Sequence, residues 1–292
     1  MARIVILGAT GRLGAALARD YGAHHKVSAW GRQEADLSHP ERVAAMVREA
    51  APEIVINCAA MTNVDECEKE RSRSELVNSA APGAVAEAAY AVGARLVHIS
   101  TDYVFSGEKT SPYSEEDQPG PVSWYGETKL AGERAVVAVD DRHAVVRVSW
   151  VFGPDRDSFV DKALQTAMRG EPVKAVADKW SSPAYTADIG EALKVLLNPA
   201  VPGGIYHVCN SGVCTWLDWA AEALRAAEQA GILGPGQTVE ALRLADISAM
   251  VARRPVHSSM SCRRIESLIG RPMRTWQEAV ADYVKARYAP AK

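Results

Sequence analysis

The sequence predicts an α/β fold, a doubly wound parallel sheet with a smaller α/β substrate-binding region in the second half of the chain. Two observations lead to this prediction. Short, β-branched apolar runs alternate with longer segments of helical period, and a glycine-rich turn directly follows the first run. Continuous rather than alternating apolar runs are typical of parallel strands that are buried on both faces. The alternation of strand and helix therefore predicts βαβ units and a parallel sheet.

Six short runs are the expected strands. They are Arg3–Leu7, Lys26–Trp30, Ile54–Asn57, Arg95–Ser100, Ala144–Ser149 and, after Gly203-Gly204, Ile205–Val208. Each is rich in the apolar and β-branched residues that suit a buried, pleated surface.

The segments between and after these strands have helical period. The stretch Ser38–Glu41 is typical of a capping box with an early proline, and it predicts a helix through Ala50. An alanine-rich helix is expected over Ser72–Val92, kinked or restarted at Pro82-Gly83. Further helices are expected over Gly126–Val139, Ser158–Arg169, Thr186–Leu197, Thr215–Ala230 and Thr275–Ala286, with a loop at Gly231–Gly236.

This order of elements predicts two regions. Residues 1–150 should form a dinucleotide-binding domain, and residues 151–292 mainly a substrate-binding domain, with some segments returning to the sheet of the first. No flexible linker separates the two regions. The second is therefore expected to pack directly on the first and to close a cleft over the carboxyl edge of the sheet.

Composition excludes several function classes. The 292 residues carry a net charge of −3 without a block of like charges, so neither nucleic acid nor a membrane surface is an expected partner. The five cysteines show no C-x-x-C spacing and no cluster with histidine, which favours free thiols and no metal site. No apolar run is long enough for a signal peptide or a membrane span, so the protein is expected in the cytoplasm.

The glycine-rich turn has the chemistry of a phosphate site. Gly8, Gly11 and Gly14 are spaced G-x-x-G-x-x-G after the first strand, and Arg12-Leu13 open the helix that follows. Glycine lets backbone N–H groups approach a pyrophosphate closely, and the helix N-terminus favours its negative charge. The alternative is a tight strand-to-helix turn that binds nothing, but the strand–turn–helix context favours a dinucleotide.

The end of the second strand indicates which nicotinamide cofactor binds. An acidic residue there would bind a ribose 2′-hydroxyl, whereas an arginine would accept a 2′-phosphate. Arg32 therefore favours NADP(H), although the nearby Glu34 keeps NADH open. Asp36-Leu37 are placed to meet the adenine ring; alternatively, Asp36 caps the next helix and Arg32 is an ordinary surface residue.

Tyr125 and Lys129 are placed for proton transfer to a carbonyl. Four residues apart on a helix, they share one face, and the ammonium is expected to lower the pKa of the phenol. Ser100-Thr101 end a strand at the carboxyl edge, where a hydroxyl can donate to a substrate carbonyl oxygen. Together with the glycine-rich turn, these residues predict hydride transfer rather than a chance surface pair.

These residues resemble the extended short-chain dehydrogenase/reductases and, more narrowly, the dTDP-4-dehydrorhamnose reductase family. The resemblance covers nearly the whole chain, and the run from Ser100 to Gly107 is the part most specific to this branch. It is carried by Gly8–Gly14, Asn57–Ala60, Thr62–Asp65 with Glu68, Ser100–Phe105 with Gly107, Tyr113, Glu115–Asp117, Tyr125–Lys129 with Gly132-Glu133, Arg147–Gly153, and Arg254-Pro255 with Ser258.

The resemblance implies a Rossmann domain that binds NADPH, with NADH open, and a site for a nucleotide sugar. It implies that Thr101, Tyr125 and Lys129 are catalytic, with Tyr125 the proton donor. The implied cofactor residues are Gly11, Arg12, Leu13, Asp36, Leu37, Ala59, Ala60 and Met61, and the implied substrate contacts are Asp102, Tyr103, Trp150 and Arg254. Two of these have structural alternatives: a core tryptophan for Trp150 and an ion pair for Arg254.

The implied reaction is NADPH-dependent reduction of the 4-keto group of dTDP-4-dehydro-β-L-rhamnose to dTDP-β-L-rhamnose. Two segments depart from the family pattern. Residues 178–184 read Asp-Lys-Trp-Ser-Ser-Pro-Ala where Asp-Gln-x-Gly-x-Pro-Thr is usual, and Ser158 replaces an asparagine. Both shape the sugar pocket, which leaves another nucleotide 4-keto-6-deoxy sugar open as substrate.

A further alternative comes from another class of protein. The regulatory β subunit of methionine adenosyltransferase resembles the same branch, binds NADP and is not catalytic. No helix carries an obvious self-complementary stripe, so the sequence does not decide the oligomeric state and leaves a homodimer open.

Overall fold

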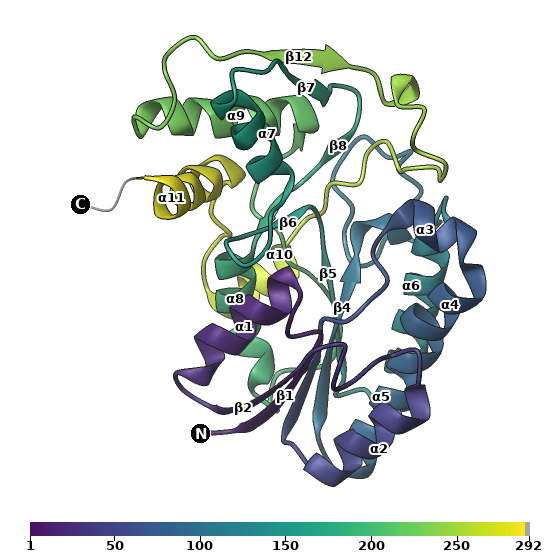
Figure 1. The fold of residues 1–292 in the computed structure, drawn as a ribbon. Helices are drawn as coiled ribbons and strands as arrows, with labels where there is room; N and C mark the ends of the chain where they lie inside the picture. Colours follow the sequence, from purple (N-terminus) through teal and green to yellow (C-terminus); the bar gives the residue numbers. More distant parts are fainter. Residues whose placement is uncertain (290–292) are drawn as a thin grey trace.

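A parallel six-stranded sheet forms the centre of the molecule (Figure 1). The computed structural model describes residues 1–289. The strand order is β2-β1-β3-β4-β5-β10, and every neighbouring pair is parallel. The strands are β1 (Arg3–Leu7), β2 (Lys26–Trp30), β3 (Ile54–Asn57), β4 (Arg95–Thr101), β5 (Ala144–Val148) and β10 (Gly204–His207). All six expected strands are therefore confirmed, with ends that differ by one residue at most.

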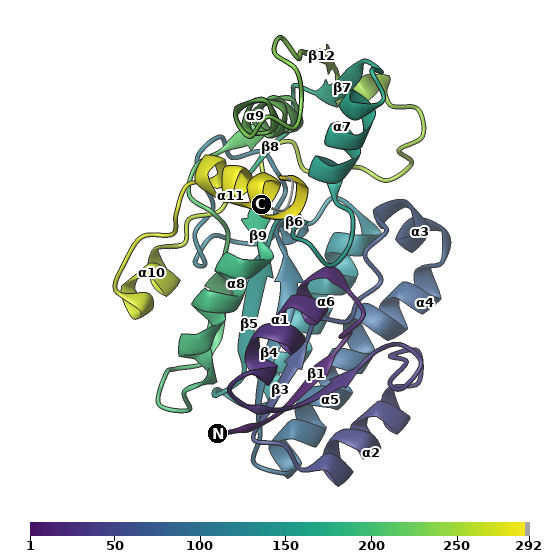
Figure 2. The same ribbon diagram turned by 60° about the vertical axis from the view of Figure 1, so that its left-hand side comes forward.

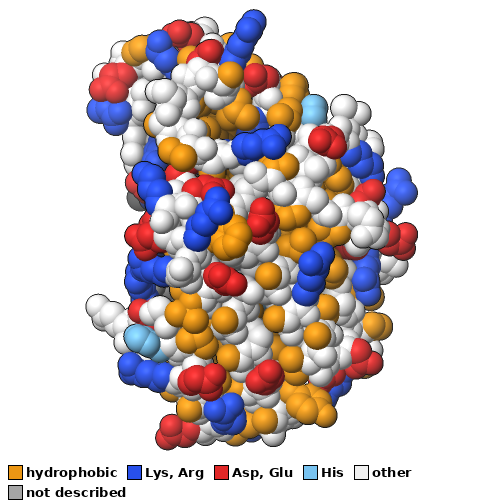
Figure 3. Space-filling view, turned by 90° about the vertical axis from the view of Figure 1, so that its right-hand side faces the viewer, with side chains coloured by type: hydrophobic (Ala, Val, Ile, Leu, Met, Phe, Trp, Pro, Cys, Tyr) orange, Lys and Arg blue, Asp and Glu red, His pale blue; other side chains and the backbone are white. Residues whose placement is uncertain are grey.

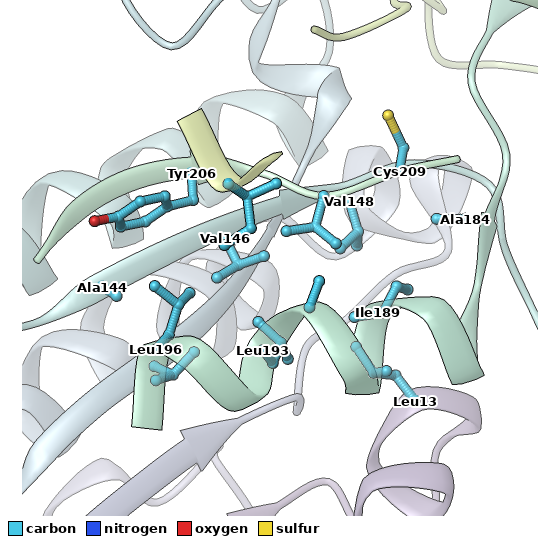
Figure 4. Close-up of a cluster of buried hydrophobic side chains, with 14 of the residues drawn as sticks. Leu13, Ala144, Val146, Val148, Ala184, Ile189, Leu193, Leu196, Tyr206 and Cys209 are labelled. Carbon is cyan, nitrogen blue, oxygen red and sulfur yellow. The ribbon is translucent and has the colours of Figure 1, made fainter. Parts of the chain in front are cut away.

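Helices cover both faces of the sheet, which confirms the doubly wound class (Figures 1 and 2). On one face lie α1 (Arg12–Gly22) and α8 (Thr186–Leu193), and on the other α2 (Pro40–Ala50), α5 (Ala81–Ala91) and α6 (Trp124–Val139). Figure 4 shows how Ile189 and Leu193 of α8 point toward Val146 and Val148 of β5. The sheet is thus buried on both sides, as its continuous apolar strands require.

The second half of the chain builds an upper lobe around a separate hydrophobic cluster (Figure 1). Its main helices are α7 (Phe159–Met168), α9 (Trp216–Gln229) and α11 (Trp276–Tyr288). Each begins at a capping box, which explains why the sequence predicted their starts closely. The shorter elements here are β6 (Val151–Phe152), β7 (Val173–Val176), β8 (Trp180–Ser181), β9 (Ala184–Tyr185), β11 (Cys214–Thr215) and β12 (Val239–Leu242). The helix α10 (Arg263–Ile269) instead packs against β10 of the central sheet.

The alanine-rich segment differs from its prediction. The chain runs through α3 (Val64–Lys69), α4 (Arg71–Glu75), a π-helical turn over Leu76–Ala80 and then α5 without a break at Pro82-Gly83. Pro82 lies in the first turn of α5, where its missing N–H costs little. The irregularity therefore precedes the proline instead of following from it, and π-turns of this kind are frequent at functional sites.

Two other local predictions need correction. Ser38 makes no side-chain cap to α2, which begins at Pro40 after His39. The predicted helix over residues 186–197 ends at Leu193 and continues as a 3₁₀ turn over Lys194–Leu197. Two further 3₁₀ turns lie at Asp102–Val104 and Leu244–Asp246.

The face that carries α3 and α4 mixes charges of both signs with scattered apolar side chains (Figure 3). Within residues 1–289, no helix has the length and hydropathy needed to cross a bilayer.

Candidate active site

The main cleft lies at the carboxyl edge of the sheet, where the direction of winding reverses between β1 and β3. Ligands bind at such reversal points in doubly wound folds. The cleft has a volume of about 1170 Å³, and it extends from the glycine-rich turn to side chains of α7 and α9. Since pockets for single drug-sized ligands occupy roughly 300–1,000 Å³, this cleft has room for more than one ligand.

Backbone packing explains the glycines of the turn. Gly8 has φ +75°, and a Cβ there would lie 2.7 Å from the Ala59 nitrogen. A Cβ at Gly14 would lie 2.2 Å from the Gly8 oxygen. Gly11 is the N-cap of α1 and brings no side chain over the helix end. The N-terminus of α1 is therefore open toward the cleft, as an anion site requires, and the residues fit a dinucleotide pyrophosphate.

Arg12 joins the glycine-rich turn to the second half of the chain. Its guanidinium donates hydrogen bonds to the carbonyl oxygens of Val151 (3.0 Å), Arg156 (3.0 Å) and Asp157. Burial lowers the pKa of Arg12. Arg12 and Leu13 both line the cleft, as expected, but Arg12 also fixes the loop that leads into α7. That second role was not predicted from the sequence.

The residues expected to meet the adenosine also line the cleft. Arg32 is two-thirds exposed, and its Nε lies 3.6 Å from Asp36 Oδ2, while Leu37 is buried. Asp36 Oδ1 accepts the Ser38 N–H at 2.9 Å, so this carboxylate orders the turn before α2 in addition to facing the cleft. Glu34 instead accepts the Gly31 N–H at 2.8 Å, which holds it in the turn.

Asn78 shapes the cleft wall formed by Ala59, Ala60 and Met61. Its Oδ1 accepts the Met61 N–H at 2.8 Å, and its Nδ2 donates to the Met61 oxygen at 3.0 Å. Because Asn78 lies in the π-helical turn, that irregular turn positions the wall beside the nicotinamide end of the predicted cofactor site.

Tyr125 and Lys129 lie on α6, one turn apart, and both side chains line the cleft. The Ser123 hydroxyl caps the helix by accepting the Gly126 N–H, so α6 starts early enough to include Tyr125. The Tyr125 ring meets the Tyr103 ring edge-on, with centroids 5.5 Å apart. Burial raises the pKa of Tyr125, and a contact with the Thr101 hydroxyl only partly opposes this. The expectation that Lys129 lowers this pKa was wrong in sign, because desolvation dominates.

Lys129 Nζ donates to the Ile99 oxygen at 2.7 Å and lies 3.3 Å from His98 Nε2. Asn57 Oδ1 accepts the Ala59 N–H, so its Nδ2 faces His98 Nδ1 as a donor at 3.2 Å. This assignment leaves the imidazole proton on Nε2, facing Lys129. The N–H of His98 Nε2 would then face the N–H groups of the Lys129 ammonium, and this contact disfavours the charged form of Lys129. Burial lowers the pKa of Lys129 to about 8.

The two hydroxyls at the end of β4, those of Ser100 and Thr101, differ in their hydrogen bonding. Thr101 Oγ1 donates to Asp102 Oδ1 at 3.1 Å and accepts the Tyr103 N–H at 3.2 Å. Ser100 borders the cleft, but its Oγ is buried with no hydrogen-bond partner among residues 1–289. Thr101 is therefore oriented by Asp102, whereas the Ser100 hydroxyl is shielded from solvent.

The far end of the cleft is aromatic. Trp150 has φ +41°, an uncommon conformation for a residue with a large side chain, and its Nε1 is buried without a partner in the described part of the chain. Its ring stacks on Trp219 with centroids 5.5 Å apart. Tyr103, Phe159 and Trp216 line the same region. Phe159 belongs to a segment that the sequence already predicted to shape the sugar pocket. Sequence reasoning missed Trp216 and Trp219, although the capping box at Thr215 places both on one helix.

Arg254, an expected substrate contact, is held in an ion pair with Asp65. Its guanidinium donates to both carboxylate oxygens of Asp65, at 2.9 and 2.6 Å, and to the Ala252 oxygen. Arg254 is not among the described residues that line the cleft. The structure thus places Arg254 in the ion pair that was its structural alternative.

We expect Asp65→Asn to weaken the acid dependence of stability. Arg254 holds the pKa of Asp65 well below its usual value. A depressed carboxyl pKa stabilises the fold above the unfolded pKa of about 3.9, and the contribution is lost as pH falls through the folded value. Denaturation of both proteins at pH 7 and at pH 2 measures this, with an expected difference at pH 7 of about 1–3 kcal/mol. An equal difference at both pH values would contradict the assignment.

A family model described as the RmlD substrate binding domain matches residues 2–289. The chain belongs to this family. Among its relatives, dTDP-4-dehydrorhamnose reductase from Mycolicibacterium smegmatis is 39% identical over 289 residues, covering 97% of this chain and 85% of the relative. A Streptomyces antibioticus protein named as a probable dTDP-4,6-dihydroxy-2-methyloxan-3-one 4-ketoreductase is 34% identical, covering 99% and 98%.

Solved structures agree with the RmlD assignment. The crystal structure of dTDP-4-dehydrorhamnose reductase from Bacillus anthracis in complex with NADP superposes with a TM-score of 0.88 at 32% identity. The match covers 97% of this chain and 98% of that one. The doubly wound dinucleotide-binding fold expected from the sequence is confirmed, and with it the RmlD family.

Proposed function

We propose that the protein is an NADPH-dependent reductase of a nucleotide 4-keto sugar, with dTDP-4-dehydro-β-L-rhamnose as substrate and dTDP-β-L-rhamnose as product. The observation that carries the proposal is the meeting of Thr101, Tyr125 and Lys129 in one cleft at the carboxyl edge of the sheet. The open helix end and the glycine cradle beside them fit a dinucleotide. Relatives named dTDP-4-dehydrorhamnose reductase, which match over nearly the whole chain, support the substrate.

The residues of the chain account for the proton side of the reaction. Bound NADPH supplies the hydride, which forms the new bond to the carbonyl carbon and leaves NADP⁺. The raised pKa keeps Tyr125 protonated at neutral pH, so its hydroxyl is ready to protonate the carbonyl oxygen as negative charge develops there. Thr101, whose hydroxyl contacts that of Tyr125 in the same cleft, is the second hydroxyl at the site of the developing charge. Lys129 lies one turn behind Tyr125, where it can hold the nicotinamide ribose.

Purified protein, NADPH and dTDP-4-dehydrorhamnose test this proposal in a spectrophotometric assay of NADPH oxidation, with product identified by mass spectrometry. We expect turnover and dTDP-rhamnose. Turnover only with another nucleotide 4-keto-6-deoxy sugar would show that this other sugar is the substrate. The Streptomyces antibioticus relative, whose name gives a different dTDP-linked substrate, is the reason to test this alternative. Tight NADP binding without any turnover would favour the regulatory reading, which resembles the methionine adenosyltransferase β subunit.

Arg32→Ala tests the cofactor preference. Arg32 lines the cleft at the end of β2, and Glu34 is held in the turn by the Gly31 N–H. We therefore expect the variant to weaken NADPH by about 10-fold and NADH by less than about 2-fold, because a charge-assisted contact to a phosphate is worth roughly 1.5–3 kcal/mol. Calorimetric titration with both cofactors measures this, and equal losses for both would rule out a phosphate contact.

Two predictions from the sequence, a cytoplasmic location and a homodimer, stay proposals. The five cysteines are all free thiols, which supports a reducing, cytoplasmic location. The homodimer is best tested by light scattering of the purified chain.

A further inference from the structure

Lys179 is a fully buried lysine close to the proposed active site. Its side chain is 0% exposed, and its Nζ donates one hydrogen bond, to the Pro255 oxygen at 2.7 Å. An ammonium has three donors, so most of its bonding capacity is unused among the described residues. Burying such a group is costly, and burial lowers the pKa of Lys179 to about 8. A residue kept at this cost needs a compensating contact.

The compensating contacts are two aromatic rings of the cleft. The ammonium lies 5.2 Å from the centroid of the Tyr103 ring and 5.6 Å from that of the Trp150 ring. Both distances are within the range of cation–π attraction, which is strongest where water is excluded. Both rings line the cleft, whereas Lys179 is not among its described lining residues. Lys179 therefore acts on the cleft from behind its wall.

The position of each ring matters for the rest of the site or for the local backbone. Tyr103 packs edge-on against Tyr125, the proposed proton donor. Trp150 is held at φ +41°, and a strained backbone of this kind persists only where its surroundings hold it in place. The negative charge of Asp102 raises the pKa of Lys179 and so favours its charged form. Asp102 Oδ2 is in turn fixed by the hydroxyls of Ser181 and Ser258.

We propose that Lys179 is a positioning residue for the sugar of the substrate, holding the Tyr103 and Trp150 rings at the reactive end of the cleft from behind. The inference rests on the proposed function of the same site and adds to it the residue that shapes the sugar pocket. The hydrogen bond and the ring contacts of Lys179 involve neither the glycine-rich turn nor Arg32, so we expect cofactor binding not to depend on it.

Lys179→Met and Lys179→Gln test the inference as a pair. Methionine removes both the charge and the hydrogen bond, whereas glutamine can still donate to Pro255 but carries no charge. We expect Lys179→Met to raise the KM for dTDP-4-dehydrorhamnose about 10- to 30-fold, the range that loss of a desolvated cation–π contact implies. Lys179→Gln restores the residue that is usual at this position in the family and should raise the KM by a smaller factor. The affinity for NADPH should stay within about 2-fold of the parent protein. An unchanged KM in both variants, or equal weakening of sugar and cofactor, would overturn the inference.

A second measurement separates this inference from the proposed function, because it needs no substrate. Near-ultraviolet circular dichroism reports the packing of Trp150 against Trp219, and we expect Lys179→Met to change it while the far-ultraviolet spectrum stays the same. An unchanged near-ultraviolet spectrum would overturn the ring-positioning role even if the parent protein reduces a different sugar. Failure of both variants to fold would make the role of Lys179 purely structural and would equally overturn it.

Discussion

Tyr125→Phe is expected to lower the turnover number by about 10²- to 10⁴-fold, the usual contribution of a general acid. The variant keeps the ring that packs against Tyr103 and loses only the hydroxyl that we propose as the proton donor. NADPH affinity should change by less than about 2-fold, because the ring and Lys129 remain in place. Steady-state kinetics with dTDP-4-dehydrorhamnose, together with a direct NADPH titration, measures both quantities.

Tyr206→Phe is a matched control for this experiment. Tyr206 is buried in β10 and donates to the Pro202 oxygen, but it is not among the described residues of the cleft. Removing its hydroxyl should therefore leave turnover unchanged within about 2-fold, although it removes a buried hydrogen bond worth roughly 1 kcal/mol. Near-normal turnover of Tyr125→Phe would mean that another group supplies the proton, with Thr101 the first to test.

Glu133→Ala is expected to destabilise the fold by about 3–5 kcal/mol, because it strands a buried charge. Glu133 on α6 accepts two hydrogen bonds from Arg147 on β5, at 2.9 and 2.7 Å, and both side chains are almost completely buried. The variant leaves the guanidinium without its carboxylate in a site that water does not reach. Urea denaturation measures the free energy of unfolding of parent and variant.

The exposed pair Lys174–Glu240 is the control for the buried pair. The two side chains are about half exposed, with Nζ and the carboxylate 2.9 Å apart. Exposed ion pairs contribute about 0–1 kcal/mol, so Glu240→Ala should have little effect. Equal losses of unfolding free energy in the two variants would show that burial of the Glu133–Arg147 pair makes it no more important for stability than an exposed pair. Because the charge of Glu133 raises the pKa of Lys129, the variant should also lower that pKa.

The sheet and most helices were predictable because their signals are local. Each central strand is a continuous apolar run, and the helices α7, α9 and α11 begin at capping boxes. The two-residue strands could not be predicted, since they exist only through pairing with distant segments, as β11 pairs with β8. The π-helical turn at Leu76–Ala80 also carries no sequence period of its own.

The candidate site was predictable where spacing alone decides the geometry. Tyr125 and Lys129 share a helical face because they are four residues apart, and the glycines of the turn follow from its tight packing. Arg254 was harder to place, because its partner Asp65 lies 189 residues away in the sequence. The pKa of Tyr125 was predicted in the wrong direction because a pairwise argument leaves out desolvation. Burial is a property of the whole fold.

The hydrogen bonds around Asp102 bear on how this protein can be re-engineered. The carboxylate joins Thr101 of the first half to Ser181 and Ser258 of the second. Exchanging residues 151–289 for those of a relative would change the donors that fix Asp102, and with them the carboxylate that orients the Thr101 hydroxyl. A chimaera designed to accept a new sugar therefore has to transplant or recreate the serines at 181 and 258 together with the loops that read the hexose.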